Sequence, residues 1–520
     1  MLRLLASVLS AGLMIAAFPG NPLPLLVWVC LVPWLLALRN AGAVAGALYS
    51  LLFSGIVWLL YLWQPFYESA ITITKSAGLA VLLTALHLFS YMLPFVVLGL
   101  VHRRFNDTLV KNAVILASIL TLVTFATPTL FSFNLGSFLY EHPLSLQLLD
   151  LSGTSLLLWA IVLVNILLRN VLVAVWENWR SRKRILSPVA KENAVALLVL
   201  ASFVVGYGLW QLDFDGKPGE TAATRKSLRI ASIQPNMGPA MRPLQVVRDN
   251  REARPFSHIE HTRRALRDHG TPDLVVWPEN GLAVACDDPI VSRKISEFAA
   301  SIAIPIMHQC VDCASRNGEG CYNQSRYVDA NGVTIGRYNK RNLVPLFERM
   351  PNLPLGSMIG SGLRQETTFL VSGNDPVLFI HDKARIIPAI CFDAQSPDLL
   401  RTGLEQGGQV VIVQSNDRIF KMSKIGLFDL AINIAGAVAM RVPMVKVSNS
   451  GYGAFLQTSG RLVPDSITPV NTALSSVHTL LLEPRSSIYR KYGNWFIYVV
   501  GVIVLLSVVS SVRRDRASPA

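Results

Sequence analysis

Three residues with reactive side chains stand at the ends of strand-like runs of this sequence. Glu279 follows "LVVWP", Lys340 ends "TIGRYNK", and Cys391 follows "RIIPAI". In one pocket, such a carboxylate takes the thiol proton, the thiolate attacks a carbonyl carbon, and the ammonium holds the oxyanion. These residue types would therefore suit acyl transfer, provided that folding brings them together.

Each of these residues also has a plainer interpretation. Free cysteines are usually inert small hydrophobes, and an acid after proline or a lysine after a strand is usually a solvated charge. The run at 386–390 is typical of a short buried strand, and the polar stretch that begins at Phe392 and Asp393 predicts a turn and a helix. Cys391 at the corner between them is either an inert residue or a nucleophile presented at an elbow.

The segments that must position these residues alternate between strand-like and helix-like patterns. Apolar β-branched runs that stop at a polar or turn residue predict strands. The alternation of strands with helices, with functional groups at the strand ends, predicts an α/β layered domain. We assign this domain to residues 225–485. The strand-like runs are "LRIASIQPN", "DLVVWPEN", "ASIAIPIMHQ", "RIIPAICFD" and "GQVVIVQSND", and the helix-like segments are "SHIEHTRRALRDH" and "SRKISEFAASI".

The chain is too apolar for an ordinary soluble protein. Hydrophobic residues make up 52% of its 520 residues, charged residues make up 15%, and the mean hydropathy is +0.42. Runs that approach the roughly 20 residues needed to span lipid as a helix predict a polytopic α-helical membrane domain with about eight spans, seven of them within residues 1–211. The runs lie at 4–18, 23–38, 43–63, 77–101, 113–132, 154–178, 193–211 and 495–512.

Basic residues fall on one side of the membrane when the eight spans are threaded in order. That side is expected to be cytoplasmic, because Lys and Arg accumulate in cytoplasmic loops, so both termini are cytoplasmic and the 225–485 domain faces outward. The net charge of +14 is largely juxtamembrane, which favours attraction to anionic lipid over nucleic-acid binding. The basic residues concerned are Arg3, Arg39, His102, Arg103, Arg104, Lys111, Arg180, Arg182, Lys183, Arg184, Lys191, Arg513, Arg514 and Arg516.

Five of the six cysteines lie in the outward domain. In an oxidising compartment, four of these five can form two disulfides, with the pairing left open, and leave Cys391 free. A Cys-x-x-Cys spacing within the four also permits metal or redox chemistry, but no second pair of matching form accompanies it, so disulfides are favoured over zinc. The four are Cys286, Cys310, Cys313 and Cys321.

The contexts of the three reactive residues resemble those of a known family. Glu279 in "VVWPEN", Lys340 in "YNKRNLVPLFER" and Cys391 in "AICFD" are similar to the Glu-Lys-Cys triad of the nitrilase, or carbon-nitrogen hydrolase, superfamily. With eight spans and the domain inserted before the last one, nearly the whole chain resembles the apolipoprotein N-acyltransferase family. This implies an αββα sandwich. Further similar stretches are "ASIQPN", "VQSND", "VSNSG", "YRKYGNWF" and "FNLGSFLYEHPLSLQLLDLSGTSLLLWAIVLVNILL".

The resemblance implies a two-step transfer at a bacterial cytoplasmic (inner) membrane, with the catalytic domain on the periplasmic side. Cys391 would take an acyl chain from a phospholipid as a thioester and pass it to the α-amino group of the diacylglyceryl-modified N-terminal cysteine of a lipoprotein. Glu279 would be the base and Lys340 the oxyanion partner. The implied enzyme is a monomer that needs no cofactor and no metal.

Supporting residues also follow from the resemblance. Glu348, eight residues after Lys340 (348 − 340), matches a second family glutamate, and Asn416 lies in the matching stretch "VQSND". Glu348 lies in a Gly/Pro-rich stretch at 345–363 that is either a mobile loop over the pocket or a plain surface loop with an exposed acid. Phe392 and Asp393, which directly follow Cys391, are the other two expected supporting residues.

The chain departs from the family pattern at several positions. Cys391, Phe392 and Asp393 stand where the family usually has Cys-Tyr-Glu, which removes a hydroxyl and shortens the reach of the acid by one methylene. The tryptophan expected shortly after "QPN" is missing, and the stretch after Asp417 lacks the aromatic-Gly pair and the downstream His and Arg pattern. These differences fit a divergent acyltransferase or a relative with another substrate.

Two other functions remain open from the sequence. In a membrane-tethered nitrilase-type amidase, water rather than an amine resolves the thioester, and the choice of acyl acceptor depends on pocket shape rather than on the triad. A non-catalytic nitrilase-like membrane protein in conjugative transfer or assembly is the third possibility. The presence of Glu279, Lys340 and Cys391 counts against a non-catalytic protein. Release of lysophospholipid would favour the acyltransferase, whereas release of ammonia or free acid would favour the amidase.

Overall fold

The computed structural model covers all 520 residues and divides the chain into two compact units. A helical unit comprises Met1–Tyr67, Val81–Gly216 and Ser487–Ala520, and a second unit, here called the sandwich unit, comprises Glu68–Ala80 and Lys217–Ser486. The structure describes every residue except 75, 106–107, 183–186, 217–225, 238–252, 280–284, 314–319, 346–347, 350–369, 418–424 and 518–520.

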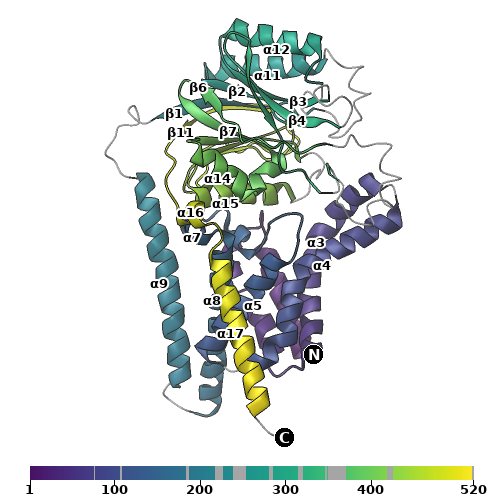
Figure 1. The fold of residues 1–520 in the computed structure, drawn as a ribbon. Coiled ribbons are helices and arrows are strands. Elements are labelled where there is room, and N and C mark those ends of the chain that lie inside the picture. Colours follow the sequence, from purple (N-terminus) through teal and green to yellow (C-terminus); the bar gives the residue numbers. More distant parts are fainter. Residues whose placement is uncertain are drawn as a thin grey trace. The chain divides into compact units, whose positions relative to one another are not determined.

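The helical unit is built from long apolar helices joined by short ones (Figure 1). Among the residues that the structure describes, four apolar helical stretches are long enough to cross a membrane, and they are Ala43–Ile71, Ala77–Phe105, Thr154–Arg180 and Pro188–Asp213. The end of α3 and the start of α4 belong to the Glu68–Ala80 segment of the sandwich unit. The elements that lie wholly or mainly in the helical unit are α1 (Leu2–Ala16), η1 (Pro24–Trp28), α2 (Val32–Leu38), α3 (Ala43–Thr74), α4 (Ala77–Val101), η2 (His102–Phe105), α5 (Val110–Ala126), η3 (Leu135–Leu139), α6 (Pro143–Leu146), α7 (Leu149–Ser152), α8 (Thr154–Arg180), α9 (Pro188–Gly216), α16 (Ile488–Tyr492) and α17 (Phe496–Ala517).

The other predicted spans correspond to shorter apolar helices. The run at 23–38 is not one helix, because η1 and α2 are separate elements and each has a proline in its first turn. The helix predicted at 113–132 ends earlier, at Ala126, because Thr127 precedes Pro128 and is extended, as residues before proline usually are. Leu2–Ala16 and Phe496–Ser511 are also apolar but shorter than the four spans above.

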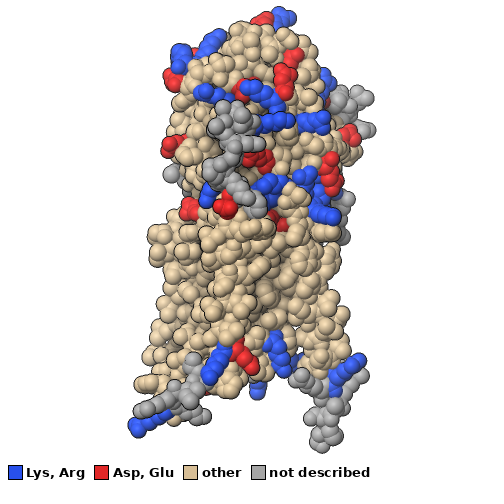
Figure 2. Space-filling view, turned by 90° about the vertical axis from the view of Figure 1, so that its left-hand side faces the viewer, with Lys and Arg blue, Asp and Glu red and all other residues tan. Residues whose placement is uncertain are grey.

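The surface of the helical unit is mostly uncharged in the view of Figure 2. Lys and Arg side chains gather at the lower end of the unit in that view. Arg39 pairs with Glu177, which joins the end of α2 to the last turns of α8. The belt of uncharged surface with basic residues at one end is the pattern expected of helices in a membrane.

The sandwich unit contains two sheets (Figure 1). The six-stranded sheet has the order β11-β1-β2-β3-β4-β5, and the five-stranded sheet has the order β10-β9-β8-β7-β6. The strands are β1 (Ser227–Gln234), β2 (Leu274–Val276), β3 (Ile306–Asp312), β4 (Tyr322–Val328), β5 (Thr334–Asn339), β6 (Phe379–His381), β7 (Ala384–Ile390), β8 (Val410–Ser415), β9 (Met444–Ser448), β10 (Ala454–Leu456) and β11 (Leu474–Leu481).

The inner strands are parallel and the outer ones antiparallel. β1, β2 and β3 pair in parallel in one sheet, and β7, β8 and β9 do so in the other. Their apolar runs are buried on both faces, as parallel strands covered by helices require. The α/β layered arrangement predicted from alternating strand and helix patterns is confirmed for this unit.

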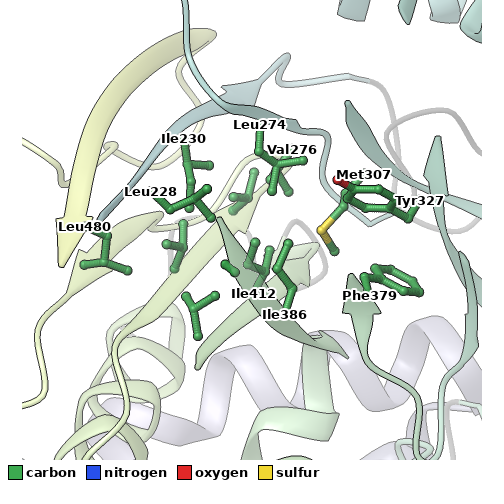
Figure 3. Packing of buried hydrophobic residues seen from close by; sticks show 14 of the residues in the cluster. Leu228, Ile230, Leu274, Val276, Met307, Tyr327, Phe379, Ile386, Ile412 and Leu480 are labelled. Atoms are coloured by element: carbon green, nitrogen blue, oxygen red, sulfur yellow. The ribbon is translucent and has the colours of Figure 1, made fainter. Parts of the chain in front are cut away.

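Two apolar clusters form the interior of the sandwich unit. One lies between the sheets and includes Ile230, Val276, Ile386 and Ile412 (Figure 3). The other packs α11 (Ala253–His269) and α12 (Pro289–Ile302) on the outer face of the six-stranded sheet. α14 (Pro397–Glu405) and α15 (Ile425–Met440) cover the five-stranded sheet, which completes an αββα order of layers (Figure 1).

Two disulfides cross-link segments of the sandwich unit, as the cysteine count predicts. Cys286 bonds to Cys310 and Cys313 bonds to Cys321, which resolves the pairing that the sequence leaves open. Because all four cysteines are used, the zinc alternative has no ligands left among them. Cys391 is free, also as predicted.

Candidate active site

The predicted site residues lie at one edge of the sandwich, where several strands end. The carboxyl ends of the parallel strands β7, β8 and β9 meet there, with Ile390 level with Gln414 and Ser415 level with Ser448. Parallel strands place their carboxyl ends together, and ligands of α/β sheets usually bind outside those ends. Cys391 follows β7 at this edge, so its position in the chain already points to a site there.

Cys391 lies on a sharp strand-to-helix corner. β7 ends at Ile390, and the 3-10 helix η6 (Cys391–Gln395) begins at once. Cys391 has φ of +48°, a left-handed conformation that is uncommon for residues other than glycine. Such strain is found mainly at functional positions, and it presents this half-buried thiol at the strand end.

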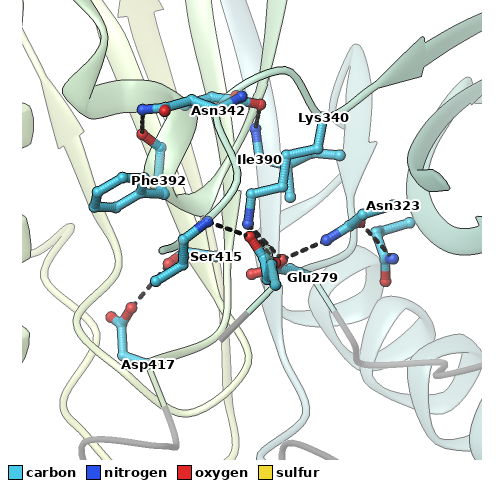
Figure 4. Close-up of polar contacts among 12 residues, drawn as sticks. Glu279, Asn323, Lys340, Asn342, Ile390, Phe392, Ser415 and Asp417 are labelled. Atoms are coloured by element: carbon cyan, nitrogen blue, oxygen red, sulfur yellow. Dashed lines mark hydrogen bonds and ion pairs between the residues drawn. The ribbon is translucent and has the colours of Figure 1, made fainter. Parts of the chain in front are cut away.

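Lys340 stands between two carboxylates. Its Nζ lies 3.3 Å from Glu279 Oε1 and 2.8 Å from Glu348 Oε1 (Figure 4). All three side chains are almost fully buried, with Glu348 only 8% exposed. Glu348 Oε2 also accepts a hydrogen bond from the Val344 N–H at 2.8 Å. The alternative of an exposed Glu348 is therefore wrong, while most of the proposed 345–363 loop lies outside the described residues.

Asn323, at the start of β4, contacts both the acid and the lysine segment. Its Nδ2 donates to Glu279 Oε1 at 2.7 Å, and its backbone carbonyl accepts from the Lys340 N–H at 2.8 Å (Figure 4). Its Oδ1 in turn accepts from Gln309 Nε2 at 2.7 Å. Asn323 is 2% exposed, so these hydrogen bonds are shielded from water and hold Glu279 beside Lys340.

A cross-sheet contact fixes the segment that carries Glu279. Gln414 on β8 donates through Nε2 to the Trp277 carbonyl at 2.6 Å, and its Oε1 accepts from the Ser325 hydroxyl. Gln414 thus ties a residue two positions before Glu279 to the sheet that carries Cys391. The link crosses from one sheet to the other within the buried interior.

Asp393 joins the Cys391 corner to the segment that carries Lys340. Its Oδ1 accepts from the backbone N–H groups of Arg341 at 3.2 Å and Asn342 at 2.7 Å. Its Oδ2 accepts from the Tyr338 hydroxyl at 2.9 Å and from the Ile390 N–H at 3.0 Å. The fully buried carboxylate therefore receives four hydrogen bonds, two of them from residues directly after Lys340.

Burial and neighbouring charges together shift the pKa values of these groups. Desolvation raises the pKa of the Cys391 thiol well above its ordinary value, and the Glu279 carboxylate adds to this effect while Lys340 opposes it. Burial also raises the pKa of Glu279, again against Lys340. Burial alone would lower the pKa of Lys340, but Glu279 and Glu348 raise it well above its ordinary value. The site thus combines a protonated thiol, a carboxylate with a raised pKa and a lysine ammonium, a set of groups that suits nucleophilic acyl chemistry.

The structure brings most of the predicted site residues to one place. Glu279, Lys340 and Glu348 are in direct contact, and the charges of Glu279 and Lys340 act on Cys391. Phe392 contributes its backbone carbonyl, which accepts from Asn342 Nδ2 at 2.9 Å (Figure 4). Asn416 is buried one residue beyond β8, where its Oδ1 lies 3.4 Å from Asn449 Nδ2.

Several residues of this site were not predicted from the sequence. Asn323, Gln309 and Gln414 are amides inside or next to strands, and amides at such positions were a usable signal, because buried strand interiors rarely hold them without partners. Lys446 on β9, which lies beside this site, was also not predicted. A fully buried lysine at the centre of the apolar run "MVKV" indicates an acidic partner elsewhere in the chain, although it does not identify that partner.

Comparisons with known proteins match both parts of the chain. Residues 229–498 match the family model for carbon-nitrogen hydrolases, and residues 10–167 match the apolipoprotein N-acyltransferase N-terminal domain. Together these two matches cover most of the sandwich unit and most of the helical unit.

Two curated relatives are similar to this chain over almost its full length. The apolipoprotein N-acyltransferase of Thermotoga maritima is 22% identical over 99% of this chain and 95% of its own length. That of Geobacter metallireducens is 24% identical over 96% of this chain and 94% of its own. Among solved structures, a carbon-nitrogen hydrolase from Helicobacter pylori G27 is 12% identical, with a TM-score of 0.38, and covers 52% of this chain and 94% of that one.

Proposed function

The chain belongs to the carbon-nitrogen hydrolase family and carries an apolipoprotein N-acyltransferase N-terminal domain, and on this premise we propose that it N-acylates lipoproteins. Its main structural support is the convergence of Glu279 and Lys340 on the Cys391 corner. Similarity to acyltransferases over both units favours this function over a free-standing amidase.

In the first half-reaction, Cys391 attacks the ester carbonyl of a phospholipid. Glu279 takes the thiol proton as the S–C bond forms, and the Lys340 ammonium lies beside the developing oxyanion. Collapse breaks the ester C–O bond, and the proton held by Glu279 passes to the leaving alkoxide. The products are a thioester on Cys391 and a lysophospholipid.

In the second half-reaction, the α-amino group of a diacylglyceryl-modified cysteine attacks the thioester. The N–C bond forms, Glu279 accepts a proton from the amine, and the C–S bond breaks. The proton then returns to sulfur, so the thiol and the carboxylate are both restored. Glu279 therefore acts as base and acid in each half-reaction, and neither half requires a metal or a redox partner.

The membrane arrangement is part of the proposal. We take the four long spans together with the shorter helices α1, η1–α2, α5 and α17 as eight crossings, seven within residues 1–211 and one at 495–512. The basic end of the helical unit then faces the cytoplasm with both termini, and the catalytic domain at 225–485 is periplasmic. In this arrangement a monomer meets both lipid substrates at the surface of the inner membrane.

Intact-protein mass spectrometry tests the first half-reaction. Protein incubated with phospholipid is expected to gain the mass of one acyl chain, and hydroxylamine should remove it because thioesters are cleaved by this reagent. Cys391→Ala should gain nothing. Cys30→Ser is the matched control, since Cys30 is the other free cysteine and lies buried in the helical unit.

Addition of an acceptor tests the second half-reaction. A synthetic peptide with an N-terminal diacylglyceryl cysteine should remove the adduct and gain the acyl chain as a hydroxylamine-stable amide. Hydrolysis of the adduct at the same rate with and without the peptide would identify a hydrolase instead. No adduct with any phospholipid would refute the proposed mechanism.

A further inference from the structure

A second buried charge cluster lies in the sandwich unit beside the candidate active site. Lys446 Nζ contacts Asp417 Oδ2, Asp429 Oδ2 at 2.7 Å and the Tyr452 carbonyl at 3.0 Å. All three charged side chains are at most 5% exposed. Asp417 Oδ1 also accepts from the Ser415 hydroxyl at 2.8 Å (Figure 4). Two carboxylates and one ammonium give this cluster a formal net charge of −1.

The cluster connects three elements that surround the nucleophile corner. Asp417 follows β8, Lys446 lies on β9, and Asp429 lies on α15. β8 is the parallel neighbour of β7, which ends immediately before Cys391, and α15 packs against η6, which begins with Cys391. The cluster therefore holds the helix that lies against the nucleophile corner.

Charged groups carried by both sheets and by α15 act on the thiol. Glu279 and Lys340 come from the six-stranded sheet, while Asp417 and Asp429 come from β8 and α15. The carboxylates of Asp429 and Asp417 both raise the pKa of the thiol, in addition to desolvation and Glu279. Burial raises the pKa of Asp429 as well, against Lys446, while the neighbouring Asp417 adds to the rise.

We propose that Asp417, Lys446 and Asp429 form a thiol-restraining cluster, which positions α15 and keeps the Cys391 sulfur protonated until Glu279 accepts its proton. The cluster carries none of the chemistry itself; its residues are positioning residues that act through their field and through α15. The inference rests on Cys391 being the nucleophile, as proposed above.

The composition of the sandwich unit gives this restraint a purpose. The unit holds two disulfides beside one free thiol. A thiolate attacks disulfides and is readily oxidised, whereas a thiol does neither at an appreciable rate. A nucleophile that ionises only in concert with Glu279 avoids both side reactions while it waits for a lipid.

Alkylation of Cys391 tests the proposal without any lipid substrate. The rate of iodoacetamide labelling is followed against pH by peptide mass spectrometry, which gives the thiol pKa in the full-length protein. Asp429→Asn removes one negative charge and should lower that pKa by about one unit. A decrease of one pKa unit raises the thiolate fraction about tenfold. A thiolate of lower pKa is also a weaker nucleophile, which lowers its rate constant about threefold, so labelling at pH 8 should be about threefold faster.

A second variant distinguishes an electrostatic effect of the cluster on the thiol pKa from an effect of looser packing around the thiol. Loss of the contact in Lys446→Met would also loosen α15, and looser packing alone would lower the thiol pKa because desolvation raises it. If the charges dominate, removal of a cation leaves the thiol pKa unchanged or higher. Asp398→Asn on α14 is the matched control, since its side chain is 87% exposed and its loss should change nothing.

The outcomes are distinct. A lower thiol pKa in Asp429→Asn, with no decrease in Lys446→Met, supports the cluster. An unchanged pKa in Asp429→Asn, or an equal decrease in both variants, overturns it. If Asp429→Asn does not fold, Asp417→Asn removes the same charge from the other partner of Lys446. Because labelling needs no substrate, failure here is distinguishable from failure of acyl transfer.

Discussion

Replacement of Asn323 by leucine tests whether the site depends on hydrogen bonds to its base. Asn323 Nδ2 donates to Glu279 Oε1 at 2.7 Å, and this hydrogen bond lowers the pKa of the carboxyl against the larger effect of burial. Leucine has a similar size but cannot donate. The Lys340 N–H still bonds to the backbone carbonyl of residue 323, so the lysine segment keeps its main-chain contact.

The size of the effect follows from the charge on the acceptor. A hydrogen bond to an ionised group contributes about 1.5–3 kcal/mol, and one pKa unit corresponds to about 1.4 kcal/mol. Lys340 still stabilises the ionised form of Glu279. We therefore expect the pKa of Glu279 to rise by about one unit. Because the base must be ionised, activity should fall about tenfold below that pKa and recover as the pH is raised.

The assay is the pH dependence of single-turnover acylation of Cys391, measured by intact mass. Asn323→Leu should move the acid limb to higher pH. Asn165→Leu makes the same change at a buried asparagine of the helical unit, and it should reduce stability without moving the limb. An acid limb that stays in place in Asn323→Leu, with activity lost equally at every pH, would refute the reasoning.

Three further changes have defined outcomes. Glu348→Gln removes a charged partner 2.8 Å from Lys340 Nζ, so the pKa of Lys340 should fall and the basic limb of the same pH profile should move to lower pH. Joint replacement of Cys286 and Cys310 by alanine opens a link between residues 24 apart, which should cost about 3 kcal/mol and lower the thermal unfolding temperature. Tyr338→Phe removes a hydroxyl that lies 2.9 Å from the buried Asp393 Oδ2, so the free energy of unfolding measured with denaturant should fall by about 1.5–3 kcal/mol.

Strand-end positions were predictable because local rules determine them. The apolar run before Cys391 and the polar residues after it indicate a strand followed by a turn, and the structure has β7 and η6 at those places. The same rule applies to Lys340, which directly follows β5. Because the rule applies to each strand separately, it predicts which residues end strands but not which ends meet.

Contacts between distant segments were not predictable from one sequence. Lys446 pairs with Asp417, 29 residues away in the chain, and with Asp429 on a helix. No periodicity relates these positions, since the pairing depends on how α15 packs on the sheet. The helix boundaries in the membrane part were also only partly predictable, because η1 and α2 divide what hydropathy shows as one run.

The shorter acid at position 393 bears on the departure from the family pattern. Sequence alone suggests that aspartate loses the reach of glutamate, and a carboxylate aimed at the substrate would indeed lose it. In the structure, Asp393 directs both oxygens at donors within the fold: three backbone N–H groups and the Tyr338 hydroxyl. An acid with this task needs donors close to it rather than a long side chain. The departure at Asp393 therefore argues less against acyl transfer than the sequence suggests, because the residue supports the Cys391 corner from behind.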